Sequence, residues 1–287
     1  LTITESHKGD GWVQARQRPV GELVDPNALK LPPYYPDHPV ARDEYANYLD
    51  AIQLVDGYFG EVLDRLQREG LDRNTIVVVS CDHGPLFRGK QFLYDNGLHI
   101  PLIVRFPDGR GAGTVDDRLV GGIDIAPTML GFAGIRPPSG AVRGIDVLRE
   151  PPQEHVFAER DRMDGTIDRM RAVRTARYKY IRNDMPGVPY MQRNGYKEKN
   201  YPTWNLVKQL HREGKLTPEA DLFAAETKPA EELYDIQADP HEVRNLALDP
   251  AHKAQLEELR GLVSAWTAAE DRSPTVPKPA SDASSEP

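Results

Sequence analysis

Apolar residues recur three and four positions apart between Tyr45 and Leu66, which predicts one long amphipathic helix. Gly70 is placed to end this helix, because glycine readily adopts the left-handed conformation found at helix C-termini. The preceding residues, 1–42, are rich in proline and polar side chains and predict an irregular surface loop. The helix is the most clearly patterned element of the chain.

Two short apolar segments follow, TIVVVS at 75–80 and IPLIVRF at 100–106. Continuous β-branched runs of this length are typical of strands buried on both faces of a parallel sheet. Residues 124–134 (DIAPTMLGFAG) predict a helix entered through Pro127. Because strands and helix alternate, this part of the chain predicts an α/β fold.

The pattern changes after about residue 150, where three segments predict antiparallel strands: HVFAER, MRAVRT and RYKYIRN. Helical patterns return at 203–225 and 250–270. We therefore divide the chain into an α/β portion, residues 1–150, and a smaller subdomain, residues 151–271. The remaining residues, 272–287, have almost no apolar content and predict a disordered tail.

Composition narrows the class of protein. The net charge of −8 argues against a surface for polyanions, so nucleic acid is not an expected partner. Cys81 is the single cysteine, which excludes an internal disulfide and a cysteine-based zinc site. The sequence has no apolar run long enough for a membrane span and no signal-peptide pattern. It opens at Leu1 within a strand-like LTIT, from which we expect that a preceding segment is missing.

Candidate chemistry lies directly after the first predicted strand, in Asp82, His83 and Gly84. Ligands of open α/β sheets gather outside the carboxyl ends of strands. A carboxylate and an imidazole side by side can both bind a divalent cation, and glycine permits a tight exit from the strand. For the tripeptide alone, an aspartate that caps a turn beside a solvent-facing histidine is the favoured alternative. Lys90 could direct its ammonium at an oxyanion held on the metal, although a loop lysine by itself is usually solvated.

The assembled string resembles type I sulfatases: a strand, D-[HN]-G, G-K, and Y-[DE]-x-G-x-x-x-P-L-I-V-R-x-P. Three further family motifs follow in order at 122–148, 171–183 and 231–247, the last being EELYDIQADPHEVRNLA. The resemblance covers essentially residues 1–270, and bacterial glycosaminoglycan and sulfamidase-like sulfatases resemble the chain most. It implies an alkaline-phosphatase-like sandwich with a mostly parallel central sheet flanked by helices. A small C-terminal α+β subdomain with an antiparallel sheet would follow, and residues 1–150 would be the C-terminal portion of the catalytic domain.

The resemblance also implies a mechanism. Members of the family attack sulfur with a formylglycine made from the cysteine of C-x-[PA]-x-R, while Ca²⁺ and cationic side chains hold the sulfate. Cys81 lies in CDHGP and does not match, so we interpret it as a buried strand-end thiol. The nucleophile motif and the first pair of metal ligands have no counterpart in this sequence. Asp82 and His83 match the second pair of ligands of one divalent cation, Ca²⁺, with His83 where many members have Asn. Lys90 matches the lysine that contacts the sulfate.

Other residues have weaker matches. His7, in TITESHKGD, corresponds to the histidine that protonates the leaving group; an exposed loop histidine is the alternative. His99 could line the substrate pocket, or it could pack at the start of a strand. Arg160, Asp161 and Asp164 could contact sugar hydroxyls or a neighbouring carboxylate, although a solvated charge run is the favoured interpretation.

We therefore expect a sulfuric ester hydrolase that acts on a sulfated sugar or aryl compound, with this chain inactive by itself. One alternative is a two-zinc phosphodiesterase or phosphatase of the same superfamily, for which His155 is the candidate further ligand. The other is an inactive truncated scaffold. Family members are commonly periplasmic, secreted or lysosomal. The sequence leaves open the choice between O-sulfate and N-sulfate, and the oligomeric state.

Overall fold

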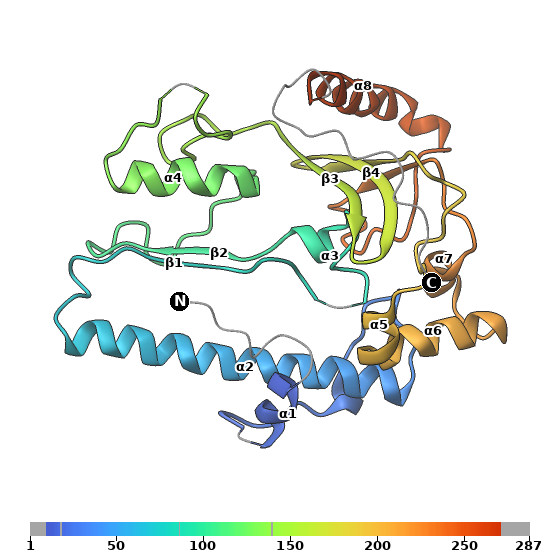
Figure 1. Ribbon diagram of the computed structural model, residues 1–287, viewed down its shortest axis with the longest axis horizontal. Helices are drawn as coiled ribbons and strands as arrows, with labels where there is room; N and C mark the ends of the chain where they lie inside the picture. The colour runs from blue at the N-terminus through green and yellow to red at the C-terminus, as the bar shows by residue number, and fades with distance from the viewer. Residues whose placement is uncertain (1–9, 18, 86, 139, 271–287) are drawn as a thin grey trace.

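The computed structural model describes residues 10–17, 19–85, 87–138 and 140–270. His7 and the tail 272–287, for which the sequence predicts a catalytic acid and disorder, lie outside the described residues. Figure 1 shows α2, the pair β1 and β2, and α4 in successive layers, with the second sheet and its helices beside them. None of the helices in these ranges is long and apolar enough to cross a membrane.

The long helix is confirmed as α2 (Pro39–Arg68). His38 caps its N-terminus, where Nδ1 accepts a hydrogen bond from the backbone N–H of Val40 at 3.2 Å. Gly70 follows the C-terminus with φ of +69°. The preceding segment is less irregular than expected, because it contains α1 (Asp10–Gln17) and a 3₁₀ turn, η1 (Pro26–Ala28). Trp12 of α1 packs on α2 in a small apolar cluster, and this packing stabilises the short helix.

The two predicted strands form, but not as a buried parallel pair. β1 (Val77–Ser80) and β2 (Leu102–Arg105) pair antiparallel, with Val77 opposite Arg105 and Ser80 opposite Leu102. Parallel neighbours need a crossover between them. Here the connection closes on itself and returns the chain beside β1. The side chains of both strands are half-buried or exposed, so the prediction of burial on both faces is wrong for these residues.

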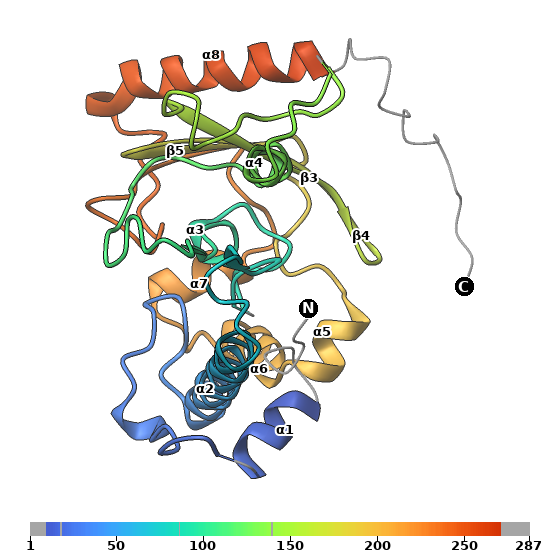
Figure 2. The ribbon, with the colours of Figure 1, turned by 90° about the vertical axis from the view of Figure 1, so that its left-hand side faces the viewer.

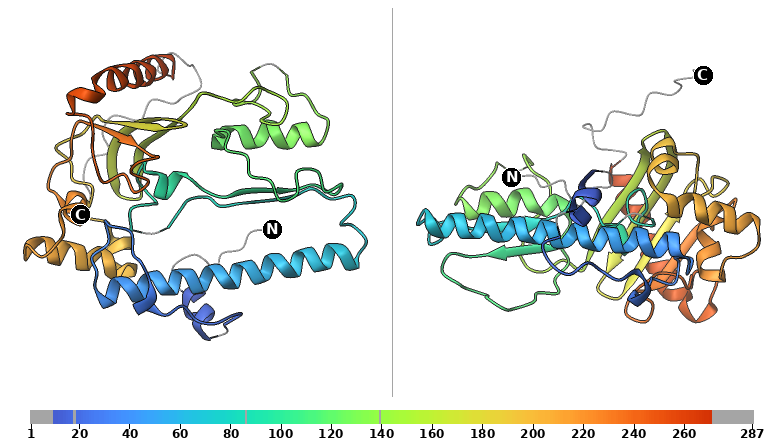
Figure 3. Two further views of the ribbon diagram at one scale, coloured as in Figure 1. Left: turned by 180° about the vertical axis from the view of Figure 1, so that it is seen from behind. Right: turned by 90° about the horizontal axis from the view of Figure 1, so that it is seen from below.

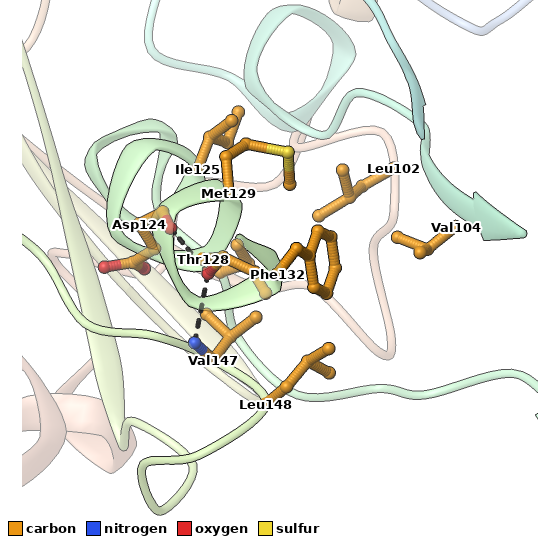
Figure 4. Close-up of a pocket in the computed structure, with 10 residues that line it drawn as sticks. Leu102, Val104, Asp124, Ile125, Thr128, Met129, Phe132, Val147 and Leu148 are labelled. Atoms are coloured by element: carbon orange, nitrogen blue, oxygen red, sulfur yellow. Dashed lines mark hydrogen bonds between the residues drawn. The ribbon is translucent and has the colours of Figure 1, made fainter. Parts of the chain in front are cut away.

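α4 (Ile125–Phe132) forms as expected after a 3₁₀ turn, η2 (Gly122–Asp124), and covers β2. Figure 4 shows Leu102 and Val104 of β2 facing Met129 and Phe132 of α4 across a small apolar pocket. The volume of this pocket is about 30 Å³. The pocket holds space for about one water molecule and lies among apolar side chains. It is a gap in the packing, and the candidate chemistry lies elsewhere.

The second half is built on an antiparallel sheet in the order β3–β4–β5–β6. Three strands were expected: β3 (His155–Met163), β4 (Thr166–Thr175) and β5 (Tyr178–Asn183). The fourth, β6 (Glu231–Asp235), comes from the last sequence motif and was not predicted. α8 (Lys253–Glu270), after η3 (Pro250–His252), covers one face of this sheet, as Figure 2 shows. Leu259 and Val263 of α8 are fully buried there.

Three shorter helices lie at the end of the sheet nearer α2: α5 (Gly195–Asn200), α6 (Pro202–Arg212) and α7 (Pro218–Ala224). Figure 3 shows α5 and α6 beside one end of α2. An aromatic core joins them to the segment after β1, where the rings of Phe92 and Phe223 lie 4.6 Å apart between centroids. The largest core therefore contains residues from both sides of position 150. The domain boundary at that position stays a prediction.

Candidate active site

The segment after β1 closes into a compact loop, here called the site loop (residues 81–85 and 87–98). The backbone N–H of Gly84 donates to the carbonyl oxygen of Gly97 at 3.0 Å. A Cβ on Gly84 would lie 1.9 Å from the carbonyl oxygen of Asn96, and one on Gly97 would lie 2.4 Å from that of Gly89. Because backbone oxygens occupy the places of the missing Cβ atoms, only glycine allows this closure. The loop ends with α3 (Asp95–Leu98).

The site loop places an oxygen and a nitrogen donor side by side. His83 Nδ1 lies 2.9 Å from the carbonyl oxygen of Gly84, to which it can only donate. In the neutral imidazole this hydrogen bond leaves Nε2 unprotonated. Nε2 is buried, makes no hydrogen bond and lies 3.4 Å from Asp82 Oδ2. Two facing lone pairs repel unless a cation lies between them, so the pair fits a divalent metal ion.

Asp82 itself is open to ligands, since its side chain is 84% exposed. Within the described ranges, no group of three or more His, Cys, Asp or Glu side chains is placed to hold a metal. In these ranges Asp82 and His83 are thus a pair without a third such side chain, and their role as metal ligands stays a prediction.

Cys81 is exposed, which corrects the prediction of a buried thiol. The reason is that β1 ends at Ser80, itself exposed, so the thiol follows the strand outside the core. Partial burial and the neighbouring Asp82 carboxylate both raise the pKa of the Cys81 thiol. A raised pKa disfavours the thiolate, which is the nucleophilic form. Cys81 is therefore poorly suited to be a nucleophile.

Lys90 is half-buried and follows the closure point of the loop. Its carbonyl oxygen accepts a hydrogen bond from Lys197 Nζ at 3.2 Å. The next residue, Gln91, has φ of +92° and donates from Nε2 to Thr166 Oγ1 at 3.0 Å. The carbonyl of Lys90 is thus bound by α5 and the side chain of Gln91 by β4, both from the second half of the chain.

Lys197 is a buried cation that sequence reasoning missed. Its side chain lies on α5, and the residue is 3% exposed. Nζ lies 4.4 Å from the ring centre of Trp204 and 5.1 Å from that of Phe92. Burial, together with the nearby charge of Arg160, lowers the pKa of Lys197 to about 7. Its neighbours in YKEKN are polar, so the sequence shows no signal that distinguishes it from a solvated lysine.

The β3–β4 hairpin lies beside this group. Arg160 is buried, with Nη1 3.4 Å from Asp168 Oδ2 and Nη2 donating to Thr166 Oγ1 at 3.0 Å. It is therefore not part of a solvated charge run. Asp161 is exposed and pairs with Arg171 at 2.9 Å.

Asp164 lies at the hairpin turn with φ of +52° and accepts a hydrogen bond from Asn194 Nδ2 at 3.2 Å. The structure thus brings Lys90, Arg160 and Asp164 into the electrostatic surroundings of Lys197. His99 is exposed after α3 and does not pack at a strand start. The substrate-binding roles of His99, Arg160, Asp161 and Asp164 stay predictions.

Comparison with known proteins agrees with these features. Residues 5–135 match the family model described as Sulfatase. An "Ulvan-active sulfatase" of Formosa agariphila is 37% identical over 84% of this chain and 41% of its own length. The human "N-sulphoglucosamine sulphohydrolase" is 29% identical over 85% of this chain and 52% of its own length. The chain thus spans about half the length of the curated relatives it matches.

A solved structure of a "2-O GAG sulfatase" shares the fold with a TM-score of 0.59 at 23% identity, over 89% of this chain and 54% of that one. This similarity confirms the alkaline-phosphatase-like α/β fold class, although the strands described here pair antiparallel. Family model, curated relatives and fold agree with the motifs of the site loop. The chain belongs to the sulfatase family.

Proposed function

We propose that the protein to which this chain belongs hydrolyses sulfate esters of saccharides. The observation that carries the proposal is the closed site loop, which places Nε2 of His83 beside Asp82 and carries Lys90 in the same loop. The names of the relatives, ulvan-active sulfatase and N-sulphoglucosamine sulphohydrolase, support a sulfated saccharide as the substrate class.

Sulfatases generally bind a divalent metal ion, and we propose that here it is Ca²⁺, held by Asp82 and His83 together with ligands from outside these residues. A carboxylate suits Ca²⁺, and one neutral nitrogen is compatible with it. When bound, the ion would offset the negative charge of the sulfate oxygens. The hydrogen bond from His83 Nδ1 to Gly84 keeps Nε2 available as a ligand.

Lys90 would contribute a point charge toward the sulfate oxygens, which stabilises the charge that develops as the ester bond breaks. Lys197 holds the peptide of Lys90 through its hydrogen bond to the carbonyl oxygen. His7 would protonate the leaving oxygen or nitrogen, a role for which imidazole is suited near neutral pH. The 287 residues contain no C-x-[PA]-x-R, so a formylglycine nucleophile would come from sequence outside them.

The test is hydrolysis of p-nitrophenyl sulfate by this chain alone and by the chain joined to a natural upstream segment that carries C-x-[PA]-x-R. We expect activity only in the joined protein, and loss of activity with a chelator and in Lys90→Ala. Lys215→Ala, at an exposed lysine, is the matched control and should remain active.

The other outcomes decide between the alternatives. Cleavage of bis(p-nitrophenyl) phosphate in place of the sulfate would indicate a two-metal phosphodiesterase. No turnover in either protein, with p-nitrophenyl sulfate or with sulfated saccharides, would indicate an inactive scaffold.

A further inference from the structure

A cluster of buried charges lies where the last sequence motif meets the site loop. Lys179 of β5 is 0% exposed and forms ion pairs with Asp95 and with Glu242, whose Oε1 lies 2.9 Å from Nζ. Glu242, 1% exposed, also accepts a hydrogen bond on Oε2 from the backbone N–H of Asp95 at 2.6 Å. Asp95, Lys179 and Glu242 are here called the anchor. The anchor joins the first residue of α3 to β5 and to the turn after β6.

The backbone of the same turn is bound from the other direction. Arg88, in the middle of the site loop, is buried and donates to the carbonyl oxygens of His241 and Glu242, both at 2.6 Å. Its guanidinium lies 3.6 Å from the ring centre of Tyr94, again in the site loop. The turn therefore holds the site loop at two points: its backbone carbonyls bind Arg88, and the side chain of Glu242 binds Asp95.

Glu242 has an uncommon backbone conformation, with φ of +53°. Glutamate rarely adopts this region, which asparagine, aspartate and glycine tolerate better. The other two non-glycine residues with positive φ in the described ranges are Gln91 and Asp164, and both border Lys90 and its surroundings. Backbone strain gathers at functional sites where the side chain is needed in one position.

A short series of hydrogen bonds leads from the anchor to His83, which with Asp82 is a proposed metal ligand. Glu242 fixes the backbone N–H of Asp95 at the start of α3. Further along α3, the carbonyl oxygen of Gly97 accepts from the backbone N–H of Gly84 at 3.0 Å. The carbonyl oxygen of Gly84 then accepts from His83 Nδ1 at 2.9 Å. The position of α3 thus determines where Gly84 presents its carbonyl to the imidazole.

We propose that Glu242 is a positioning residue for His83: by holding α3, it keeps the imidazole in the Nδ1–H form with Nε2 turned toward Asp82. The importance of this for catalysis rests on the proposed metal site, but the tautomer is a property of the chain alone. Partners that fix the tautomer of a ligand histidine commonly change metal affinity 10- to 100-fold. The glutamate of the last sequence motif thereby acquires a role in the site loop, 147 positions away along the chain.

The test is ¹⁵N NMR of the His83 ring nitrogens in this chain, recorded at alkaline pH where the ring signals no longer change with pH. The signal is assigned by its loss in His83→Gln. We expect the wild type to show Nδ1 protonated and Nε2 unprotonated. Glu242→Met removes the acceptor for Asp95, and the ring should then show an averaged mixture of both tautomers. Glu242→Gln keeps an acceptor oxygen and should retain the wild-type tautomer.

Glu44→Met is the matched control. Glu44 is also buried, and its Oε2 accepts a backbone N–H at the start of a helix, that of Thr203 at 2.7 Å, but it lies outside the series. This variant should lose stability and keep the tautomer of His83. A folded Glu242→Met chain that retains the wild-type signals would overturn the proposal, as would the same tautomer change in Glu44→Met.

If Glu242→Met does not fold, Glu242→Asp replaces it. Aspartate keeps the charge and suits a positive φ, but it is one methylene shorter and draws the carboxylate back from Asp95. The mixed tautomer is then expected in Glu242→Asp, and a wild-type spectrum would reject the role of Glu242. Neither result depends on enzymatic activity, so failure of the proposed function is recorded separately.

Discussion

The ammonium nitrogen of Lys197 lies 3.2 Å from the carbonyl oxygen of Lys90. One lysine thus binds the backbone of another, with two aromatic rings beside the buried amine. The arrangement holds the peptide of the proposed sulfate-binding residue without occupying its side chain. It also places a cation where burial disfavours charge, and this has a measurable effect on stability.

We predict that Lys197→Met changes the pH dependence of stability. The pKa of Lys197 is about 7 in the folded chain and near 10.5 when unfolded, so the unfolded state binds more protons between these values. The free energy of unfolding of the wild type should therefore rise between pH 7 and 10.5, by up to about 4–5 kcal/mol from this group. Below pH 7 the buried amine is charged, and its burial destabilises the fold by this full amount. Urea denaturation across this range should show the rise reduced in Lys197→Met. Lys199→Met, at an exposed lysine on the same helix, should follow the wild-type curve.

Two glycine substitutions should change the stability of the fold in opposite directions. In Gly84→Ala the new methyl would meet the carbonyl oxygen of Asn96 at 1.9 Å, so the site loop has to open, at a cost of about 3 kcal/mol. Gly60 lies in the exposed middle of α2, where a new methyl would have no atom within 4 Å, and Gly60→Ala should stabilise by about 0.5–1 kcal/mol. Thermal unfolding of both variants measures the difference. Equal stability of the two would contradict the loop closure described here.

Arg160 should matter for folding. Its guanidinium and Lys228 share the fully buried carboxylate of Asp168. Arg160→Met leaves that carboxylate with one cation and should cost about 3 kcal/mol. Arg162→Met, two residues along the strand at an exposed arginine, should stay within about 0.5 kcal/mol of the wild type. Denaturant midpoints of the two variants test this prediction. An equally small loss of stability in Arg160→Met would contradict a buried ion pair between Arg160 and Asp168.

Glu232 should be sensitive to the loss of charge. Its fully buried carboxylate accepts hydrogen bonds from four neutral donors, at 2.6 to 2.9 Å: Tyr94, Tyr190, Tyr234 and Asn183. Glu232→Gln places an NH₂ group among these donors and should destabilise by about 2–3 kcal/mol. Burial and, after it, the Glu232 carboxylate raise the pKa of Tyr94, so its hydroxyl stays a donor at neutral pH.

The comparison for that variant is Glu231→Gln, at the adjacent, partly exposed residue that pairs with Arg260 at 2.7 Å. An exposed pair contributes little, so we expect a loss below about 1 kcal/mol. Urea unfolding monitored by tyrosine fluorescence distinguishes the two, and similar losses would argue against a special role for the buried carboxylate.

Local pattern was sufficient for the elements whose side chains alternate between core and solvent. The spacing from Tyr45 to Leu66 predicted α2, and Gly70 marked its end, because helix periodicity and C-terminal glycine act within a few residues. The strands β3 to β5 were likewise predicted from short alternating segments. The sequence was sufficient to propose Asp82, His83 and Lys90 as site residues, because the three lie within nine positions of one another in one loop.

Only the tertiary structure decided the direction of β2 and the burial of Lys197 and Glu242, because these depend on which distant segments of the chain meet. The direction of β2 follows from the closure of Gly84 on Gly97, which no strand pattern records. Lys197 and Glu242 look like solvated residues in the sequence, yet both are buried against a loop more than 100 positions away. Burial, which only folding creates, lowers the pKa of one and makes the other's hydrogen bond to Asp95 costly to lose.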